Sequence, residues 1–205
     1  MTAKELKDSL VVHLQKPFNA KILLNTSRLI NENDRKTSAY TDPNYIPFYY
    51  HLGKIIQPKN VLEIGLRLGL TATAFTRSCL SVEHYLALQE SRPDIYYSAR
   101  LAKANIRDHF KGNLSIHVGS ITDDIFVNMM ESRRWDSIII NDEFGFDQHL
   151  LFLEMIYPHV ELGGWVICDY MSHKPAAKAW EGFCKSKNRT PEYFDTRYCV
   201  SIIQK

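Results

Sequence analysis

Short apolar runs alternate with amphipathic stretches along most of the chain, and this rhythm predicts strands that alternate with helices. The runs that we expect to be strands cover residues 60–64, 84–90, 114–119, 135–142 and 165–170. Apolar residues at helical spacing predict helices over residues 4–15, 45–56, 71–80, 91–110, 123–132, 146–160 and 175–187. Gly163 and Gly164 are expected to form a tight turn before the fifth strand.

The order of these elements predicts the fold class. Strands that alternate with helices form a mostly parallel sheet with helices on both faces, and strands buried on both sides read as continuous apolar runs. Two last strands, 193–196 and 198–204, are expected to form a hairpin around Asp195, Thr196 and Arg197. We therefore expect an α/β, Rossmann-like, doubly wound sheet of seven strands with a C-terminal antiparallel hairpin.

The first part of the chain is expected to be organised differently. Pro17 ends the first helix, and residues 18–44 mix a short apolar run with a long polar stretch. We interpret residues 1–44 as a helix and an irregular arm that could act as a lid. Residues 45–205 then form the α/β domain.

Composition narrows the class of partner. The chain has 205 residues, of which 45% are apolar and 23% charged, enough for one domain with a sizeable core. The net charge of +2 gives no support for a nucleic-acid or acidic-membrane partner, and no long apolar run predicts a signal peptide or a membrane span. The four cysteines lack metal-ligand spacing, so we expect a reducing, cytoplasmic setting. The expected partner is a small-molecule substrate, and a homodimer is left open.

One stretch, residues 60–74, carries the strongest chemical signal. It begins as a strand that contains Glu63, breaks at Gly65 and Gly69, and continues as a helix. A strand, a glycine turn and a helix N-terminus bring backbone N–H groups together, and such a turn receives nucleotide-like ligands.

Polar residues recur where the predicted strands end. In an open parallel sheet, ligands bind beyond the carboxyl ends of the strands. The residues in that position are Gly65 to Gly69, Glu90, Gly119 with Ser120, Asn141 to Glu143, and Asp169 with Tyr170. A purely structural sheet does not need this recurrence, so we expect the ligand site there.

Four of these segments resemble the class I S-adenosylmethionine-dependent methyltransferases, and among them the small O-methyltransferases of the catechol and caffeoyl-CoA type. The segments are LEIGLRLG, LALQESRPDIYYSARLAKANI, WDSIIIND and VELGGWVICDY. The first is similar to the glycine loop of that family, the second to its second strand and helix, and the last two to its fourth and fifth strands. The likeness spans roughly residues 45–205 and implies methyl transfer to a small acceptor, at oxygen.

The resemblance implies cofactor contacts at Glu63, Gly65, Leu66, Gly69, Glu90, Ser120, Ile121 and Asn141. Glu63 would lie near the methionine ammonium, because a carboxylate holds a cation well. Glu90 would accept both ribose hydroxyls. Ser120 and Ile121 would flank the adenine, and Asn141 would border the methionine portion or the reacting sulfonium.

The chain departs from this family at the metal-binding positions. Metal-dependent members hold a divalent cation with an acid after the fourth strand and an Asp-Asn pair after the fifth, whereas here the matching residues are Asn141, Asp169 and Tyr170. Mg²⁺ prefers carboxylate oxygens, so a metal at Asn141 and Asp169 is left open, with Asp142 or Glu143 as substitutes. Arg67 replaces the middle glycine of the loop.

The sequence also leaves the catalytic group and the function class open. A hydroxyl nucleophile must lose its proton, and Asp169, Asp142 and His173 are the candidate groups. An NAD-type oxidoreductase on a related fold is one alternative, although the turn does not read G-x-G-x-x-G. A catalytically degenerate methyltransferase-fold binding module is the other.

Overall fold

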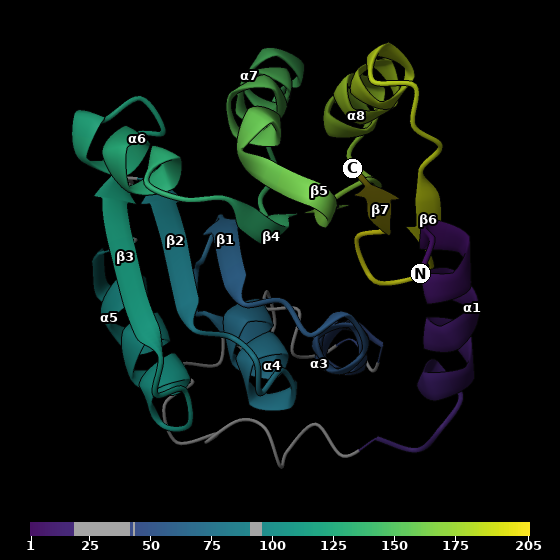
Figure 1. Cartoon of the computed structure of the whole chain (residues 1–205), viewed down its shortest axis with the longest axis horizontal. Coiled ribbons are helices and arrows are strands. Elements are labelled where there is room, and N and C mark those ends of the chain that lie inside the picture. The colour runs from purple at the N-terminus through teal and green to yellow at the C-terminus, as the bar shows by residue number, and fades with distance from the viewer. Residues whose placement is uncertain (19–41, 43, 91–95) are drawn as a thin grey trace.

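Seven strands form one sheet in the order β3-β2-β1-β4-β5-β7-β6 (Figure 1). They belong to a computed structural model that describes residues 1–18, 42, 44–90 and 96–205. The strands are β1 (Asn60–Ile64), β2 (His84–Glu90), β3 (Asn113–Gly119), β4 (Trp135–Ile140), β5 (Val160–Cys168), β6 (Glu192–Phe194) and β7 (Val200–Gln204). Neighbours from β3 to β5 are parallel, and β7 runs antiparallel to both β5 and β6. The predicted seven-stranded α/β sheet and its C-terminal hairpin are confirmed.

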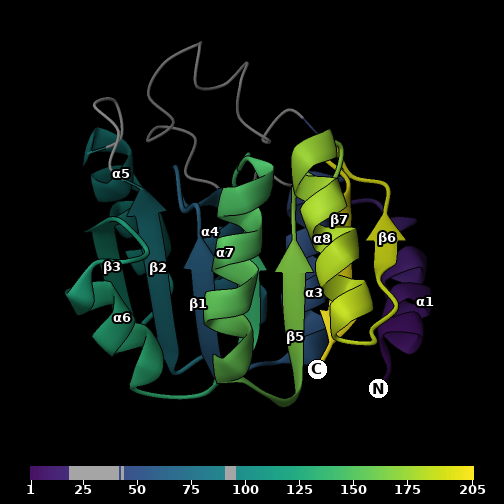
Figure 2. The ribbon, with the colours of Figure 1, turned by 90° about the horizontal axis from the view of Figure 1, so that it is seen from above.

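Helices cover both faces of this sheet (Figures 1 and 2). On one face lie α1 (Ala3–Leu14), α3 (Tyr45–Ile56), α4 (Leu70–Ser78) and α5 (Tyr96–Arg107). On the other lie α6 (Asp124–Glu131), α7 (Phe146–Ile156) with the short 3₁₀ helix η4 (Tyr157–His159), and α8 (Lys174–Ser186). The three-layer arrangement is the one that a parallel sheet requires to bury both of its faces.

The alternation of side chains along each strand divides the core in two. In β1, Val61 belongs to the hydrophobic cluster under α3, α4 and α5, whereas Leu62 and Ile64 belong to the cluster under α6, α7 and α8. Glu63 has the same parity as Val61 and is fully buried. The sequence thus places one carboxyl group inside the α3–α4 side of the core.

Backbone hydrogen bonds hold the strand exits in register. The Gly65 N–H donates to Leu88 O (2.9 Å), the Asn141 N–H to Ile64 O (2.7 Å) and the Asp169 N–H to Ile140 O (2.8 Å). The strand order reverses at β1, because β2 follows on one side and β4 lies on the other. The loops after β1, β2, β4 and β5 therefore meet at the switch point of the sheet.

The predicted turn at Gly163 and Gly164 is wrong, because β5 already begins at Val160 and continues through both glycines. The register with β4 shifts between Trp135 and Ser137, and Gly163 has a φ of +80°. The Gly163 N–H donates to Lys205 O, so this part of β5 is hydrogen-bonded to the last residue of the chain. An irregularity of this kind lengthens a strand where the sequence pattern suggests that it should stop.

Other differences concern element ends and edges. The helix predicted over 146–160 ends at Ile156, and Pro158 then lies in the 3₁₀ turn. The helix predicted to reach residue 110 ends at Arg107. The third strand was expected to be buried on both faces, but β3 is the edge strand and its residues are half-buried or exposed. The first residues predicted for the 91–110 helix, 91–95, lie outside the described residues.

The N-terminal helix α1 packs on the edge of the sheet beside β6 and against α3 (Figure 2). Thr2 and Glu5 form a capping box at its start, and Leu6 and Leu10 are fully buried in the α3–α4 core. Most of the arm predicted over 18–44 lies outside the described residues, so the division at residue 44 stays a prediction. Among the helices that the structure describes, none is both long enough and apolar enough to cross a bilayer.

Candidate functional site

The turn between β1 and α4 is a close-packed cradle of backbone. Gly65 has a φ of +91°, and a Cβ there would lie 2.3 Å from the carbonyl oxygen of Asn141. Gly69, at +70°, is the N-cap of α4 and supplies no capping side chain. The first N–H groups of α4 therefore face the turn without a side-chain acceptor from the cap, which suits an anionic group of a ligand. Leu66 is buried, and its carbonyl accepts from the Gly69 N–H.

A buried hydrogen-bond network lies directly beneath this turn. Glu63 accepts from the Tyr85 hydroxyl at 2.7 Å and from the Asn141 amide at 3.1 Å. The same amide donates to Thr71 Oγ1 at 2.8 Å, and the amide oxygen accepts from the Tyr45 hydroxyl at 2.9 Å. Residues from β1, β2, α3, α4 and the β4 exit are thus joined through one asparagine.

Asp169 forms the second buried carboxyl group of the site. It follows β5, and it is fully buried. Tyr49, one helical turn after Tyr45, donates to its Oδ2 at 3.3 Å, and the Tyr170 N–H donates to its Oδ1 at 2.7 Å. Two tyrosines on one face of α3 therefore reach the exits of β4 and β5.

Burial changes the titration of both acids. It raises the pKa of Glu63 to about 7, although the hydrogen bonds from Tyr85 and Asn141 favour the charged form. It raises the pKa of Asp169 to about 6, against the nearby Tyr45 hydroxyl and the hydrogen bonds from the Tyr170 backbone N–H and the Tyr49 hydroxyl. A carboxyl group with a pKa near neutrality is poised to respond to a cation that comes close to it.

The residues predicted to hold a ribose and an adenine lie along the neighbouring strands. Glu90 is half-buried at the end of β2, and its Oε1 accepts from Gln148 of α7 at 2.6 Å. Ser120, after β3, is exposed, and its N–H donates to Asp123. Ile121 is buried and packs in the cluster under α6 and α7. These three positions therefore follow adjacent strands at one end of the sheet.

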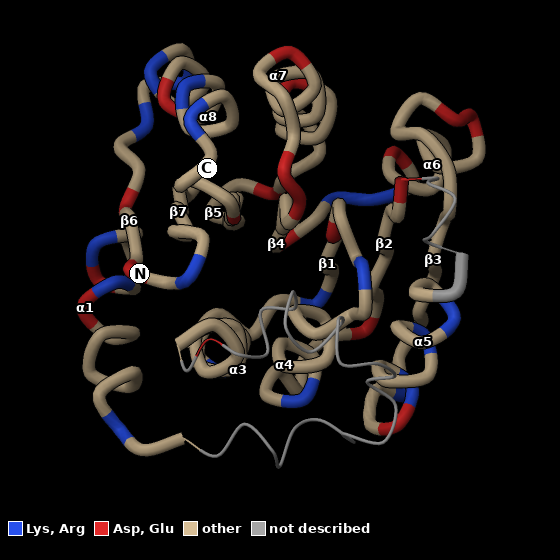
Figure 3. The backbone as a smooth tube through the Cα atoms, turned by 180° about the vertical axis from the view of Figure 1, so that it is seen from behind, with Lys and Arg blue, Asp and Glu red and all other residues tan. Residues whose placement is uncertain are grey.

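Arg67 connects the turn to the exits of β4 and β5. Its Nη2 donates to Asp142 Oδ1 at 2.6 Å, and its guanidinium lies 5.3 Å from the centre of the Tyr170 ring. Asp142 is only 2% exposed, whereas the Arg67 side chain is 46% exposed. Figure 3 marks the acidic positions between β4 and α7. The arginine thus places a solvent-facing positive charge over a buried negative one.

The histidine predicted as a base lies beside a second, buried histidine. His173 is the N-cap of α8, and its Nε2 lies 3.7 Å from Glu143 Oε1. His149 of α7 is fully buried, and in the described part of the chain neither of its ring nitrogens has a hydrogen-bond partner. Burial, and next the charge of His173, lower the pKa of His149 to about 4. His173 also contacts the site through its backbone N–H, which donates to Tyr170 O at 2.9 Å.

The side chains at the family's metal positions do not fit a divalent cation. The Asn141 oxygen already accepts from Tyr45, and Asp169 accepts from Tyr49 and from the Tyr170 N–H. Tyr170 stacks on Tyr198 with a centroid separation of 4.3 Å. Among the described residues, no group of three histidine, cysteine, aspartate or glutamate side chains is arranged to hold a metal. Mg²⁺ prefers several carboxylate ligands, and this donor set has one carboxylate, that of Asp169.

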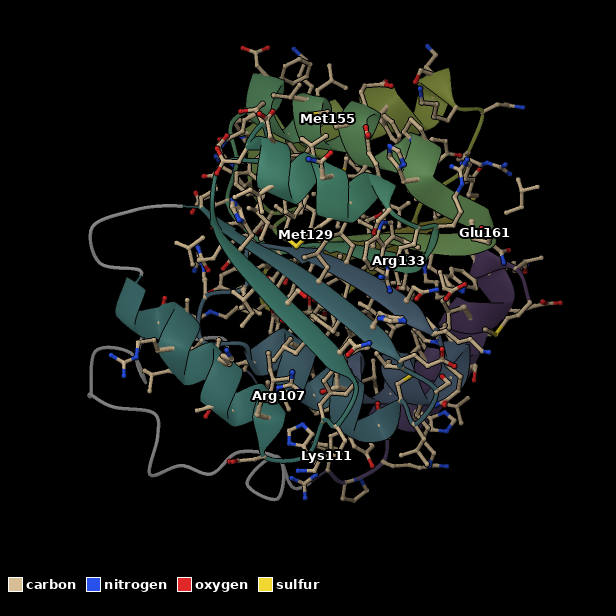
Figure 4. All side chains as sticks on the ribbon, turned by 60° about the vertical axis from the view of Figure 1, so that its left-hand side comes forward. Arg107, Lys111, Met129, Arg133, Met155 and Glu161 are labelled. Atoms are coloured by element: carbon tan, nitrogen blue, oxygen red, sulfur yellow. The ribbon has the colours of Figure 1, made fainter. Side chains whose placement is uncertain are left out.

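A cavity of about 260 Å³ lies at the opposite end of the sheet, where the strands begin. Its lining includes Arg107, Met129 and Arg133, which Figure 4 labels beside β3. Tyr85 and Trp135 also line it. Ligands of open parallel sheets bind at the carboxyl ends, so this cavity is separate from the candidate site.

Several residues of the site were not predicted from the sequence. They are Tyr45, Tyr49, Thr71, Tyr85, Gln148 and Tyr198. The spacing of Tyr45 and Tyr49 shows that they share a helix face, and Thr71 lies in the first turn after the glycine loop. Which sheet edge that face meets is set by the docking of α3, and one sequence does not specify it.

Comparison with solved structures shows which fold this is. The O-methyltransferase from Bacillus cereus in complex with S-adenosylhomocysteine matches 98% of this chain over 100% of its own, with 16% identity and a TM-score of 0.69. A methyltransferase from Geobacter sulfurreducens matches 100% of the chain over 99% of its own, with 14% identity and a TM-score of 0.66. The O-methyltransferase TomG from Streptomyces achromogenes, involved in tomaymycin synthesis and solved with S-adenosylmethionine, matches 100% over 98%, with 11% identity and a TM-score of 0.63.

The chain therefore has the Rossmann-like fold of the methyltransferases, as the resemblance in its motifs implied. No protein-family model matches the sequence. No curated protein matches it either.

Proposed function

We propose that this chain is an S-adenosylmethionine-dependent methyltransferase that acts on a small-molecule acceptor at oxygen. The observation that carries the proposal is the cradle after β1, where Gly65 and Gly69 hold left-handed backbone directly above Glu63 and Asn141. The solved structures of the same fold include complexes with S-adenosylmethionine and S-adenosylhomocysteine, which supports the same ligand class here.

The residues of this chain fit the chemistry of that ligand. Glu63 and Asn141 would receive the ammonium of the methionine part, and the α4 N-terminus would receive its carboxylate. Glu90 would hold the ribose hydroxyls, and Ser120 and Ile121 would flank the adenine. Leu66 and the two glycines would form the wall of the turn. When bound, the sulfonium supplies an activated methyl group, so the protein contributes mainly placement and exclusion of water.

Proton removal from a neutral acceptor hydroxyl would fall to a side chain near the strand exits. Asp169 has a pKa near 6, so its carboxyl group is largely ionised at neutral pH and can accept a proton. Asp142 is held by Arg67, and His173 lies next to Glu143, so both are further from that role. We assign no step to a metal ion, because the donor set at Asn141 and Asp169 does not suit one.

The oxidoreductase alternative has no observation in its favour. Glu90 after β2 suits the ribose of either cofactor, but the turn contains Arg67 where a dinucleotide fold keeps its second glycine. The methyltransferase structures share the fold of this chain over nearly its whole length, which supports the methyltransferase instead.

Isothermal titration with S-adenosylhomocysteine tests the proposal. We expect binding, and we expect Glu90→Ala to weaken it by about 1–3 kcal/mol, the loss typical of hydrogen bonds to a charged group. Glu83→Ala is the matched control, because Glu83 is an exposed acid just before the same strand. Absence of binding at high micromolar ligand, or an equal loss in both variants, would sink the assignment.

Turnover separates an enzyme from a binding module of the same fold. We expect S-adenosylhomocysteine to accumulate when the protein is incubated with S-adenosylmethionine and a panel of phenols, carboxylic acids and alcohols. Tight cofactor binding with no product on that panel would favour the catalytically degenerate module.

A further inference from the structure

Arg67 joins the exits of three neighbouring strands. The sheet order β1-β4-β5 places the turn after β1, the exit of β4 and the exit of β5 side by side. Arg67 comes from the first of these, Asp142 from the second and Tyr170 from the third. The guanidinium therefore lies against the exits of β4 and β5. Metal-dependent members of the family that this chain resembles hold a divalent ion at these two exits.

Three contacts fix the arginine in this position. Asp142 accepts from Nη2, the Gln89 side chain accepts from the Arg67 backbone N–H, and the Tyr170 ring lies beneath the guanidinium. A guanidinium has five N–H donors, and hydrogen bonds to the described residues occupy one of the four on its terminal nitrogens. The side chain is also about half exposed. Donors thus remain to bind an acidic group that approaches from solvent.

A stack of two tyrosine rings lies next to the arginine. Tyr170 stacks on Tyr198 with an interplanar angle of 13°, and the Arg197 guanidinium lies 5.0 Å from the centre of the Tyr198 ring. Tyr45 meets Tyr198 edge-on at 6.2 Å. Tyr170 is buried in this stack and Tyr198 is half-buried, so Tyr198 is the ring that a planar ligand can contact.

Backbone strain gathers at the same place. Arg67, Tyr170 and Cys199 have φ values of +46°, +63° and +57°. These values lie in the left-handed region, which residues other than glycine rarely adopt. Strain of this kind persists where the surrounding structure fixes it, and it clusters at functional sites. The three residues belong to three separate loops, so packing of a single turn does not account for them.

We propose that Arg67, held by Asp142 and stacked on Tyr170, binds the anionic oxygen of a planar acceptor in place of a metal ion. This inference rests on the proposed methyltransferase function. The acceptor would be an aromatic carboxylic acid or an acidic phenol, ionised at neutral pH. In the transfer, the acceptor oxygen forms a bond to the methyl carbon, the carbon–sulfur bond breaks, and its electron pair stays on sulfur. The anionic acceptor becomes a neutral methyl ester or ether, and no proton has to be removed.

Benzoate and its neutral isostere benzamide test this subsite by NMR-observed titration, each with and without saturating S-adenosylhomocysteine. We expect benzoate to bind roughly tenfold more tightly, because a charge-assisted hydrogen bond to arginine discriminates by at least that factor. Arg67→Met, which keeps the length of the stem, should abolish the preference. Arg77→Met is the control, because Arg77 is an exposed arginine at the far end of α4.

Removal of Arg67 takes a positive charge away from the buried Asp142, so the single variant can lose its fold. The double variant Arg67→Met with Asp142→Asn removes both charges and should also lose the preference. Equal affinity for the two probes, a preference that survives either Arg67 variant, or one that requires millimolar MgCl₂ would overturn the proposal. If S-adenosylhomocysteine binds but benzoate is not preferred, only the subsite fails. If benzoate is preferred but S-adenosylhomocysteine does not bind, the methyltransferase assignment fails instead.

Discussion

Glu63 is the buried carboxyl group on which the proposed binding of the methionine ammonium depends. It is fully buried within a strand, and its two oxygens each accept one hydrogen bond from a neutral group. Burial raises its pKa to about 7, so near neutral pH it is only partly ionised in the free protein. A ligand ammonium would supply the missing counter-charge and lower that pKa.

Binding of S-adenosylhomocysteine should therefore depend on pH. Because the ammonium prefers the ionised form of Glu63, affinity should rise up to about tenfold per pH unit below pH 7 and level off above it. Titration calorimetry in buffers of different ionisation enthalpy should detect a proton released on binding below pH 7. Glu63→Gln should remove both effects, while Asp169→Asn should leave them in place. A pH dependence that follows Asp169 would contradict the assignment of Glu63.

At the scale of elements, glycine has opposite effects in two helices. Gly182 lies exposed inside α8, and a Cβ there meets nothing within 4 Å. Gly69 caps α4 with a φ of +70°, and a Cβ there would lie 2.9 Å from the Cβ of Ala102. Gly182 therefore lowers the stability of α8, and no packing contact requires a glycine there. Gly69 is required because its backbone has a left-handed conformation.

Gly182→Ala should consequently stabilise the protein by roughly 0.5–1 kcal/mol, the usual difference between alanine and glycine inside a helix. Gly69→Ala should destabilise it by more than that, because alanine pays the left-handed strain and also collides with α5. Urea denaturation of both variants measures the two effects. A loss of stability in Gly182→Ala would show that α8 has an unrecognised constraint at this position.

The same scale shows what the sequence could predict. The helix over 45–56 and the alternation of strands and helices along the chain were predictable because buried strands and amphipathic helices leave a clear apolar period. The glycines of the β1 turn predicted the candidate site, because they interrupt the apolar pattern locally between a strand and a helix. The path of β5 through Gly163 and Gly164 was not predictable, because pairing with the chain end overrides the turn preference of two glycines. The reach of Arg67 to Asp142 and Tyr170 also depends on how three loops pack, which no local pattern records.

At the scale of the whole molecule, the buried ionisable groups act on stability with opposite signs. Glu63 and Asp169 have raised pKa values, so their contribution is present below the ordinary carboxyl pKa and is lost as pH rises through about 7 and 6. His149 has a lowered pKa, because burial favours its neutral form. Between pH 6.5 and about 4, His149 binds a proton in the unfolded chain but not in the folded protein. The free energy of unfolding therefore falls as pH drops through this range.

Replacement of His149 should isolate that last contribution. The ring is fully buried near Phe144 and Phe152, so His149→Phe keeps an aromatic group there and removes two nitrogens that lack partners among the described residues. The variant should be more stable than the parent, and its advantage should grow by up to roughly 3 kcal/mol as pH falls from 6.5 to about 4. Urea unfolding across this range, with His159→Phe as the matched control on η4, measures the difference. An advantage that does not change with pH would mean that His149 accepts a proton inside the folded protein, and the cluster with His173 and Glu143 would then be an ionised one.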